Sequence, residues 1–472
     1  SLLLLRYHLK EKYQNKQKRV RFEYSDLSNT LEFLQEYPVI LSTTYSIKSS
    51  LDLTETLFDY VIIDEASQVD LVTGFLALSC AKNAVIVGDT KQLPNVIPGN
   101  KRPVIEELTQ KHTIPLHYDF SKQSLLSSMI ATLPEVSKVM LKEHYRCHPK
   151  IIEFCNKKFY DNALIILSED KGEGDVIEAF VTQEGNHARG YYNQREIDVI
   201  IKEVLPPLQT KTTKDKIGII TPFKNQKTHL QNSLNAMEID TIHKYQGREK
   251  EAIILSTVKN EIDAFIDDAN LLNVAISRAK RFLRVVISAQ VYQSNSHLRD
   301  LISYIEYHNF EIKQSKVKSI FDLLYKANAK ARMQYLKDKK KISSYDSENI
   351  AYHTIKECVR AYGNLDVITH IPLYRILNAT EDLKEEEMEF IQKSHVDLLI
   401  FNIMNKAPIL AIEVDGFAYH KKDSKQGKRD AMKDYILQKC GIELLRLSTI
   451  QSNEVERIEA CLKKQAIFSQ YS

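Results

Sequence analysis

The chain has 472 residues, which is enough for two to four domains that each bury their own core. With 43% hydrophobic and 27% charged residues and no apolar run near the ~18 residues that cross a bilayer, the composition argues against a membrane span, and we expect a cytoplasmic protein. The net charge of +3 excludes a strong global field, so nucleic-acid binding would require local basic patches.

Short runs rich in valine and isoleucine alternate with longer helical patterns along the chain. In chain order these runs cover residues 38–43, 60–64, 84–89, 217–222, 252–257 and 282–289. Because they are almost continuously apolar, they predict strands buried on both faces of a parallel sheet, and therefore an α/β fold. A shorter α/β pattern follows, with a helix from 347, strands near 364–376, 396–402, 408–415 and 442–447, and a helix over 428–440.

Two breaks in this pattern suggest domain boundaries. The first is "ATLPEVSK" (131–138), and the second is a lysine-rich segment before residue 345. We expect domains over 1–135, 136–312 and 345–472, with a basic linker over 313–344. The basic side chains of the linker either bind nucleic acid or form a solvated helix face.

The six cysteines form no CxxC pair. We expect them to be reduced thiols, because this spacing argues against an iron–sulfur cluster and suits a cytosolic protein.

The run "VIIDEASQ" places Asp64 and Glu65 at the end of a predicted strand. In that position Asp64 can hold Mg²⁺ through water and Glu65 can polarise an attacking water. The alternative is a pair of capping carboxylates. At the end of the next strand, "IVGDTKQLPN" (86–95) carries Gln92, which would sense a γ-phosphate.

Four later segments add polar and basic side chains. They are "LKEHYRCHPKI" (141–151) with Arg146, "IGIITPFKNQ" (217–226), "DTIHKYQGREK" (240–250) with Gln246, Gly247 and Glu249, and "NVAISRA" (273–279) with Arg278. Two arginines from separate segments suit a phosphoryl-transfer site, because a planar guanidinium matches the charge on the γ-oxygens. Taken singly, Arg146 could be a surface ion pair and Arg278 part of a helix face.

In order and spacing these motifs resemble those of superfamily 1 helicases of the nonsense-mediated-decay helicase type, over about residues 35–290. The resemblance implies two RecA-like parallel-sheet domains, with ATP between them and single-stranded nucleic acid across the top. It implies that Asp64 and Glu65 serve Mg²⁺ and water, that Gln92, Arg146 and Arg278 serve the γ-phosphate, and that Gln246, Gly247 and Glu249 couple nucleotide to nucleic acid. Thr43, Thr221, Pro222 and Thr241 would face the nucleic-acid backbone, and the role of His243 stays open.

A phosphate loop of the form GxxxxGK[ST] is absent from the sequence, whose single Gly-Lys pair is Gly427-Lys428. The first RecA-like domain is therefore expected to be incomplete and to lack its phosphate-loop strand. Three explanations are open: a chain that begins after the loop, a degraded motor, or a loop supplied by another chain.

The segment "KSHVDLLIFNIMNKAPILAIEVDGFAYH" (393–420) predicts two strands that carry Asp397, Glu413 and Asp415. Glu413 and Asp415 are two residues apart and therefore share a face. Converging buried acids are costly unless a cation neutralises them, and oxygen ligands suit Mg²⁺ or Mn²⁺. The sequence therefore predicts a metal site here.

Residues 345–450 resemble PD-(D/E)XK nucleases, in particular the branch near very-short-patch-repair endonucleases. The resemblance implies a restriction-endonuclease-like α/β domain in which Asp397, Glu413 and Asp415 hold the metal. Glu348 would be an accessory acid, and His420 and Lys433 could assist the scissile phosphate. Asp415 stands where the usual lysine would be, so we assign the lysine role to Lys433.

Together these features predict an ATP-dependent helicase coupled to a metal-dependent endonuclease, acting on DNA rather than RNA in bacterial DNA processing or antiphage defence. We expect nucleic acid, and a protein partner or a second copy, as binding partners. The rival hypotheses are a non-catalytic nucleic-acid clamp and a subunit whose missing half sits on another chain.

Overall fold

The computed structural model describes residues 6–7, 10–11, 30–51, 56–185, 187–377, 383–416 and 425–471. By their internal contacts these residues divide into two units, Ser1–Leu141 and Lys142–Ser472. This division lies close to the boundary expected near residues 131–138. No helix in the described ranges is both long and apolar enough to cross a lipid bilayer.

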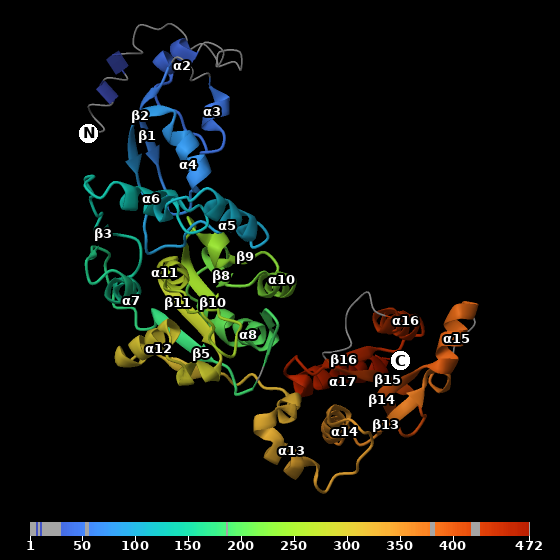
Figure 1. Cartoon of the computed structure of the whole chain (residues 1–472). Coiled ribbons are helices and arrows are strands. Elements are labelled where there is room, and N and C mark those ends of the chain that lie inside the picture. The colour runs from blue at the N-terminus through green and yellow to red at the C-terminus, as the bar shows by residue number, and fades with distance from the viewer. Residues whose placement is uncertain are drawn as a thin grey trace. The chain divides into compact units, whose positions relative to one another are not determined.

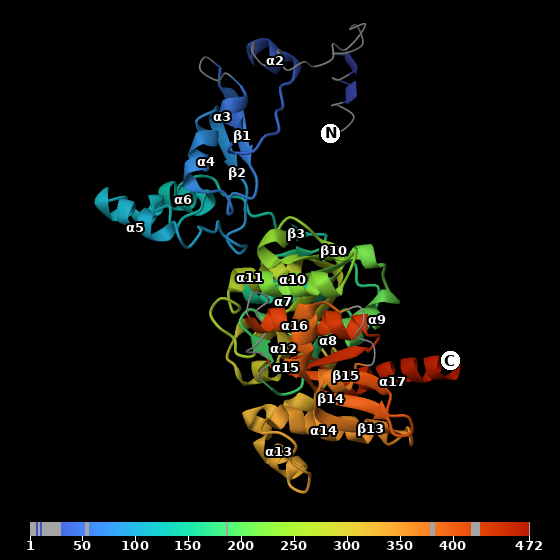
Figure 2. The ribbon, with the colours of Figure 1, turned by 90° about the vertical axis from the view of Figure 1, so that its right-hand side faces the viewer.

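The first unit contains a two-stranded parallel sheet. Its elements are α2 (Thr30–Glu36), α3 (Ile47–Ser50), β1 (Phe58–Ile63), α4 (Leu71–Leu78), β2 (Ala81–Ile86), α5 (Arg102–Lys111), η2 (Leu116–Tyr118) and α6 (Leu125–Thr132). Strands β1 and β2 lie side by side, with α3 and α4 next to them (Figure 1, Figure 2). Asp70 caps α4 by accepting a hydrogen bond from the backbone N–H of Thr73 at 3.0 Å.

Two expectations for this unit were wrong. Residues 38–43 form no strand, and Leu41 is 94% exposed. Strands β1 and β2 are not buried on both faces, because Tyr60, Ile62 and Val85 are exposed.

The second unit begins with a six-stranded sheet in the order β12-β5-β11-β10-β8-β9, in which every pairing is parallel. Its strands are β5 (Ile177–Val181), β8 (Ile217–Thr221), β9 (Glu238–Thr241), β10 (Lys250–Ser256), β11 (Ala279–Ile287) and β12 (Ile312–Gln314). The central strands β8, β10 and β11 are almost wholly buried, as their continuous apolar runs predict.

Helices cover both faces of this sheet. They are α7 (Pro149–Phe159), α8 (Gln194–Val199), α9 (Leu205–Gln209), α10 (Lys224–Ser233), α11 (Ala269–Ser277) and α12 (His297–Tyr307). Helices α8 and α10 lie on one face and α11 and α12 on the other (Figure 1). Short elements complete the region: β3 (Glu143–His144), β4 (Ile165–Ile166), β6 (Ala188–Arg189), β7 (Tyr192–Asn193), η3 (Ile200–Val204), η4 (Lys214–Lys216), η5 (Ile242–Tyr245) and η6 (Ala289–Gln293).

The segment expected to be a basic linker, 313–344, is more ordered than a linker. It contains most of β12, η7 (Ile320–Leu324), η8 (Lys326–Asn328) and α13 (Ala329–Leu336). Val317 belongs to the core beside the six-stranded sheet, whereas Phe321 belongs to the core of the following sheet. A buried ion pair of 2.8 Å between Arg195 and Asp322 ties the segment to α8.

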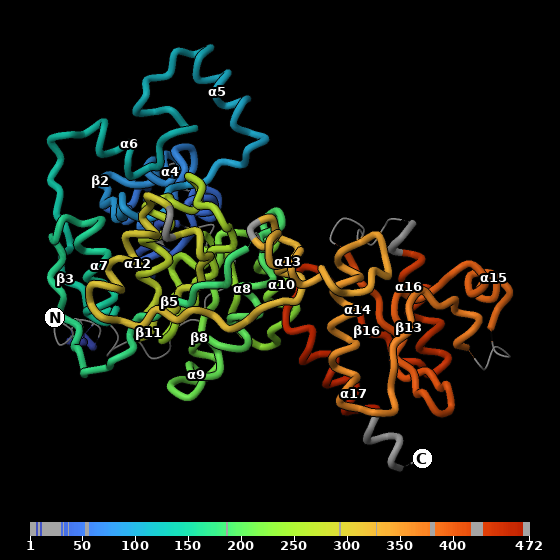
Figure 3. The backbone as a smooth tube through the Cα atoms, turned by 90° about the horizontal axis from the view of Figure 1, so that it is seen from below, coloured from blue at the N-terminus to red at the C-terminus, as the bar shows by residue number. Residues whose placement is uncertain are grey.

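The last region is a four-stranded mixed sheet in the order β13-β14-β15-β16, in which only β15 and β16 run parallel. Its elements are α14 (Asp346–Val359), β13 (Leu365–Pro372), η9 (Leu373–Arg375), α15 (Glu385–Lys393), β14 (His395–Asn402), β15 (Pro408–Asp415), α16 (Lys425–Lys439), β16 (Leu444–Ser448) and α17 (Glu454–Tyr471). Helices α14 and α17 pack on one face and α15 and α16 on the other (Figure 3). This sheet presents Asp397, Glu413 and Asp415.

Candidate functional site

The turns that follow β1 and β2 meet at one end of the first sheet. The backbone N–H of Ala66 donates to the carbonyl of Val87 at 2.9 Å, and that of Asn95 donates to the carbonyl of Ser67 at 2.9 Å. Gly88 permits this approach, since a Cβ there would lie 3.2 Å from the backbone nitrogen of Ala66. The two predicted motifs are therefore neighbours.

Within these turns Glu65 has a left-handed backbone, with φ of 52°. Its N–H donates to Oδ1 of Asp64 at 2.8 Å, and its Oε2 accepts from Gln68 at 3.2 Å. Gln92 donates from Nε2 to Oδ2 of Asp89 at 3.2 Å. Asp64 is exposed, so its carboxylate is accessible to an ion.

In the second unit, Arg146 and Lys280 converge on Glu249. Nε of Arg146 and Nζ of Lys280 each lie 2.5 Å from a different carboxylate oxygen of Glu249. The Lys280 hydrogen bond and the charges of Arg146 and Arg278 lower the pKa of Glu249, although burial opposes them. Arg278 is buried and donates to the backbone carbonyls of Val274 and Arg248, both at 3.4 Å.

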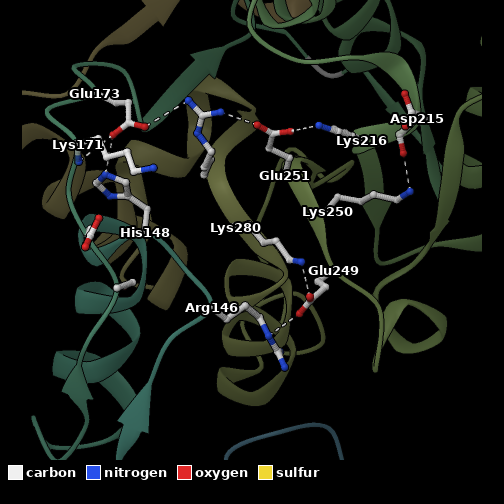
Figure 4. Close-up of a pocket in the computed structure, with 13 residues that line it drawn as sticks. Arg146, His148, Lys171, Glu173, Asp215, Lys216, Glu249, Lys250, Glu251 and Lys280 are labelled. Atoms are coloured by element: carbon white, nitrogen blue, oxygen red, sulfur yellow. Dashed lines mark hydrogen bonds and ion pairs between the residues drawn. The ribbon is translucent and has the colours of Figure 1, made fainter.

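Arg146 and Glu249 line an open cavity of about 750 Å³, and Figure 4 shows their side chains with Lys280 at one side of it. Arg281 lies in the same cavity, 2.5 Å from Glu251 and 3.3 Å from Glu173. Sequence reasoning missed Lys280 and Arg281, although both directly follow the "ISRA" motif. The cavity is lined by charged side chains of both signs.

The residues expected to face nucleic acid differ in how exposed they are. Thr221, Pro222 and Thr241 are buried at the ends of β8 and β9, so their side chains are not available at the surface. Gln246 is half-buried, and Gly247 adopts φ of 77° with open space beside it. Thr43, in the first unit, is exposed, and its hydroxyl lies 2.9 Å from that of Ser46.

An aromatic cluster lies beside these buried residues. Phe223, which directly follows Pro222, packs against the exposed rings of Tyr191 and Phe265 at centroid distances of 4.9 and 5.5 Å. The His243 ring is parallel to that of Phe265 within 7°, and Nζ of Lys259 lies 5.1 Å from the Tyr191 centroid. Sequence reasoning missed this cluster because its members come from separate segments.

In the four-stranded sheet, Asp397 and Glu413 lie on adjacent strands and touch each other's backbone. The Asp397 N–H donates to Oε1 of Glu413 at 3.3 Å, and the Val414 N–H donates to Oδ2 of Asp397 at 2.9 Å. Nζ of Lys433, on α16, lies 2.7 Å from Oε2 of Glu413. Burial raises the pKa of Glu413 to about 7, with a contribution from Asp397 that Lys433 opposes.

Asp415 does not join this group. Nη1 of Arg446, on β16, contacts both of its oxygens at 3.0 and 3.1 Å, and Arg446 also binds Asp434 at 2.7 Å. Of the three acids expected to hold a metal, Asp397 and Glu413 are therefore neighbours, whereas Asp415 is paired with Arg446. Glu348 lies in the first turn of α14, as expected, and His420 lies outside the described residues.

Three family matches cover most of the chain. Residues 5–98 and 121–290 match two families described as AAA domains, and residues 340–465 match a family described as a protein of unknown function, DUF2726.

Several curated relatives are named as helicases. An uncharacterized ATP-dependent helicase of Methanocaldococcus jannaschii is 29% identical over 303 residues, covering 58% of this chain and 42% of that protein. The 5′-3′ DNA helicase ZGRF1 of Mus musculus is 27% identical, covering 54% and 14%. The DNA replication ATP-dependent helicase/nuclease dna2 of Schizosaccharomyces pombe is 25% identical, covering 63% and 23%. The chain thus spans less than half the length of these relatives.

Among solved structures, an arterivirus nonstructural protein 10 helicase with DNA has a TM-score of 0.29 and 12% identity, covering 59% of this chain and 56% of that one. The PRRSV helicase has a TM-score of 0.27 and 16% identity, covering 48% and 34%. Residues 5–98 and 121–290 are therefore similar to AAA domains, and this part of the chain is similar to proteins named as ATP-dependent or DNA helicases.

Proposed function

We propose that this chain carries the machinery of an ATP-dependent DNA helicase or translocase joined to a metal-dependent nuclease. The observation that carries the proposal is the group of Asp397, Glu413 and Lys433. Two converging carboxylates beside an ammonium suit phosphodiester cleavage with a divalent ion. The same polypeptide contains two segments similar to AAA domains. A strand translocated by the motor would therefore reach the nuclease centre. The setting we propose is bacterial DNA processing or antiphage defence.

For the motor, ATP with Mg²⁺ would supply the phosphoryl transfer that drives movement. The Arg278 guanidinium, which donates to two backbone carbonyls, would serve the γ-phosphate. Arg146 shares Glu249 with Lys280 and can exchange that partner for phosphate oxygens. Asp64, Glu65 and Gln92 would serve the ion, the water and the γ-phosphate.

For nucleic acid, the aromatic cluster around Phe223 supports binding of a single strand. Exposed rings of Tyr191 and Phe265 offer faces on which bases stack, and Lys259 beside Tyr191 adds a cation for the backbone. Stacking is tolerant of sequence, as a translocating motor requires.

For cleavage, the residues fit a divalent ion because Asp397 and Glu413 bring carboxylates to one end of two adjacent strands. A bound ion would neutralise the scissile phosphate and lower the pKa of an attacking water. Asp397 and Glu413 would hold the ion. Lys433 would donate to Glu413 or to a phosphate oxygen.

The 472-residue chain alone is expected to hydrolyse ATP weakly or not at all. Without the GxxxxGK[ST] loop, the β- and γ-phosphates lose their backbone N–H cradle and its lysine. The measurement is steady-state phosphate release with single-stranded DNA, for wild type and Glu65→Gln. Robust release that disappears in Glu65→Gln would contradict the prediction.

The nuclease is tested by incubating labelled single-stranded DNA, duplex DNA and RNA with Mg²⁺, Mn²⁺ or EDTA. We expect metal-dependent cutting of DNA. Asp397→Asn should reduce the cleavage rate by more than ~10–100-fold, which is the loss typical of mutating a residue that only hydrogen-bonds to a metal ligand. Asp366→Asn is the matched control, since Asp366 lies on β13 and pairs with Lys356 at 3.6 Å, outside the site. Binding without cutting under every metal would favour the non-catalytic clamp instead.

A further inference from the structure

We propose that His370, His395 and Asp397 form a binding site for a divalent transition-metal ion, such as Mn²⁺ or Zn²⁺, that shares Asp397 with the proposed nuclease centre. One donor atom from each of these residues can be chosen so that all three lie within 4.8 Å of one another. Ligands at the usual ~2.0–2.2 Å from one ion lie up to about 4 Å apart, so small rotamer changes close the set. The metal site does not depend on the proposed function. Only the statement that Asp397 is shared with a nuclease centre rests on that function.

The pairing of β13 with β14 brings these side chains together. His395 and Asp397 are two residues apart on β14 and therefore share a face. The antiparallel register pairs Ile371 with Val396 and Thr369 with Leu398, which sets His370 opposite Asp397. The imidazole rings of His370 and His395 have centroids 5.9 Å apart.

His370 is held in a conformation that a histidine rarely adopts. Its φ is 49°, in the left-handed region, although it lies within strand β13. Backbone strain of this kind concentrates at ligand sites, where the surrounding structure maintains it. Here the residue with this conformation is the one that the strand register sets opposite Asp397.

Glu348 lies beside the His370 ring, where a carboxylate can orient a metal-binding histidine. Its Oε2 lies 3.4 Å from Nε2 of His370, and this oxygen is buried without a hydrogen-bond partner. A small rotation of the His370 ring would turn this approach into a hydrogen bond from Nε2, which would fix the tautomer and leave Nδ1 for an ion. On the other side, Oδ2 of Asp397 accepts the Val414 N–H, so Oδ1 remains for the ion.

The donor set selects the class of ion. Two imidazoles and one carboxylate suit borderline first-row metals, whereas Mg²⁺ and Ca²⁺ prefer oxygen ligands throughout. A second group in the described ranges, His148 with Asp170 and Glu173, does not fit an ion. Nδ1 of His148 accepts the Lys150 N–H at 3.2 Å, so the proton is on Nε2, the nitrogen that faces both carboxylates.

The test uses the full chain, stripped of metal with EDTA and dialysed, then loaded with one equivalent of Mn²⁺. Pulsed electron paramagnetic resonance detects coupling of Mn²⁺ to imidazole nitrogen, and calorimetry with Zn²⁺ gives affinity and stoichiometry. Wild type should show nitrogen coupling, which His370→Ala and His395→Ala should weaken or abolish with at least a tenfold loss of Zn²⁺ affinity. Glu348→Gln should lose about tenfold.

His353→Gln, on α14 but outside the cluster, is the matched control, and His395→Gln with circular dichroism checks folding. Mn²⁺ bound without nitrogen coupling in wild type, or unchanged Zn²⁺ binding in both alanine variants, overturns the proposal. Loss of metal binding in these variants with no cleavage by any form keeps the site and rejects the nuclease. Cleavage that persists in both histidine variants with unchanged metal binding keeps the nuclease and rejects the site.

Discussion

Replacing Glu178 by alanine is expected to destabilise the six-stranded sheet by up to about 3–5 kcal/mol, because it removes the nearer of the two carboxylates that pair with a buried guanidinium, the other being Asp175 at 3.2 Å. Glu178 on β5 and Arg284 on β11 are paired in register, and Nε of Arg284 lies 2.6 Å from Oε2 of Glu178. Their side chains are only 6% and 2% exposed. The second carboxylate oxygen accepts from Nζ of Lys313 on β12 at 2.7 Å, so one residue joins three neighbouring strands.

Hydrogen exchange followed by mass spectrometry measures this effect locally, in peptides that cover β5 and β11. Glu311→Ala is the matched control, since Glu311 pairs with the same Lys313 at 3.1 Å but is 61% exposed, and exposed pairs contribute about 0–1 kcal/mol. A double variant, Glu178→Leu with Arg284→Met, should lose less than Glu178→Ala alone, because it removes both buried charges. If Glu178→Ala exchanges no faster than Glu311→Ala, the ion pair does not stabilise the sheet.

The strand pattern of the second unit could be predicted because burial on both faces leaves a continuous apolar run. The same reasoning failed for residues 38–43, which are apolar but pair with no described strand, so Val39 and Leu41 remain exposed. A run of this kind reports only the tendency to be buried. Whether a neighbour exists to bury it depends on the rest of the fold.

The site residues show the same division between local and long-range information. The spacing of Glu413 and Asp415 predicts that they share one face of β15. It does not predict that Arg446, on the parallel strand β16, pairs with Asp415. His370 and His395 come together only through the register of β13 and β14. The order of the motifs placed Arg146 and Glu249 in one predicted site. The aromatic cluster belongs to no motif, so only the structure reveals it.

The burial of Thr221 and Thr241 has a similar cause. A threonine at the end of a strand is compatible both with a ligand contact and with core packing. No repeating pattern in the sequence distinguishes a buried threonine from an exposed one at this position. In the described structure the rings of Tyr191 and Phe265, which pack against Phe223, reach the surface, whereas the threonines do not.

The carboxyl group of Glu196 is expected to make the six-stranded sheet less stable as pH rises from about 4.5 to about 7. Glu196 on α8 is fully buried and accepts from the Val258 N–H at 2.9 and 3.0 Å and from Ser256 Oγ at 2.6 Å. Burial raises its pKa from 4.5 to about 7, although these hydrogen bonds oppose the shift. Val258, which it binds, has an unusual φ of 74°.

The direction follows from proton binding. Between pH 4.5 and 7 the folded state holds the proton and the unfolded state releases it, so the stabilising contribution is complete below 4.5 and is lost by about pH 7. A shift of this size corresponds to about 3 kcal/mol. Glu196→Gln cannot titrate. The free energy of unfolding of wild type minus that of the variant should therefore fall by about that amount across this range. The measurement is hydrogen exchange of the β10 and β11 amides at increasing urea concentration. The exposed Glu184→Gln controls for loss of one surface carboxylate. A difference between wild type and Glu196→Gln that stays constant with pH would show that the hydrogen bonds from Val258 and Ser256 outweigh burial and keep Glu196 ionised throughout.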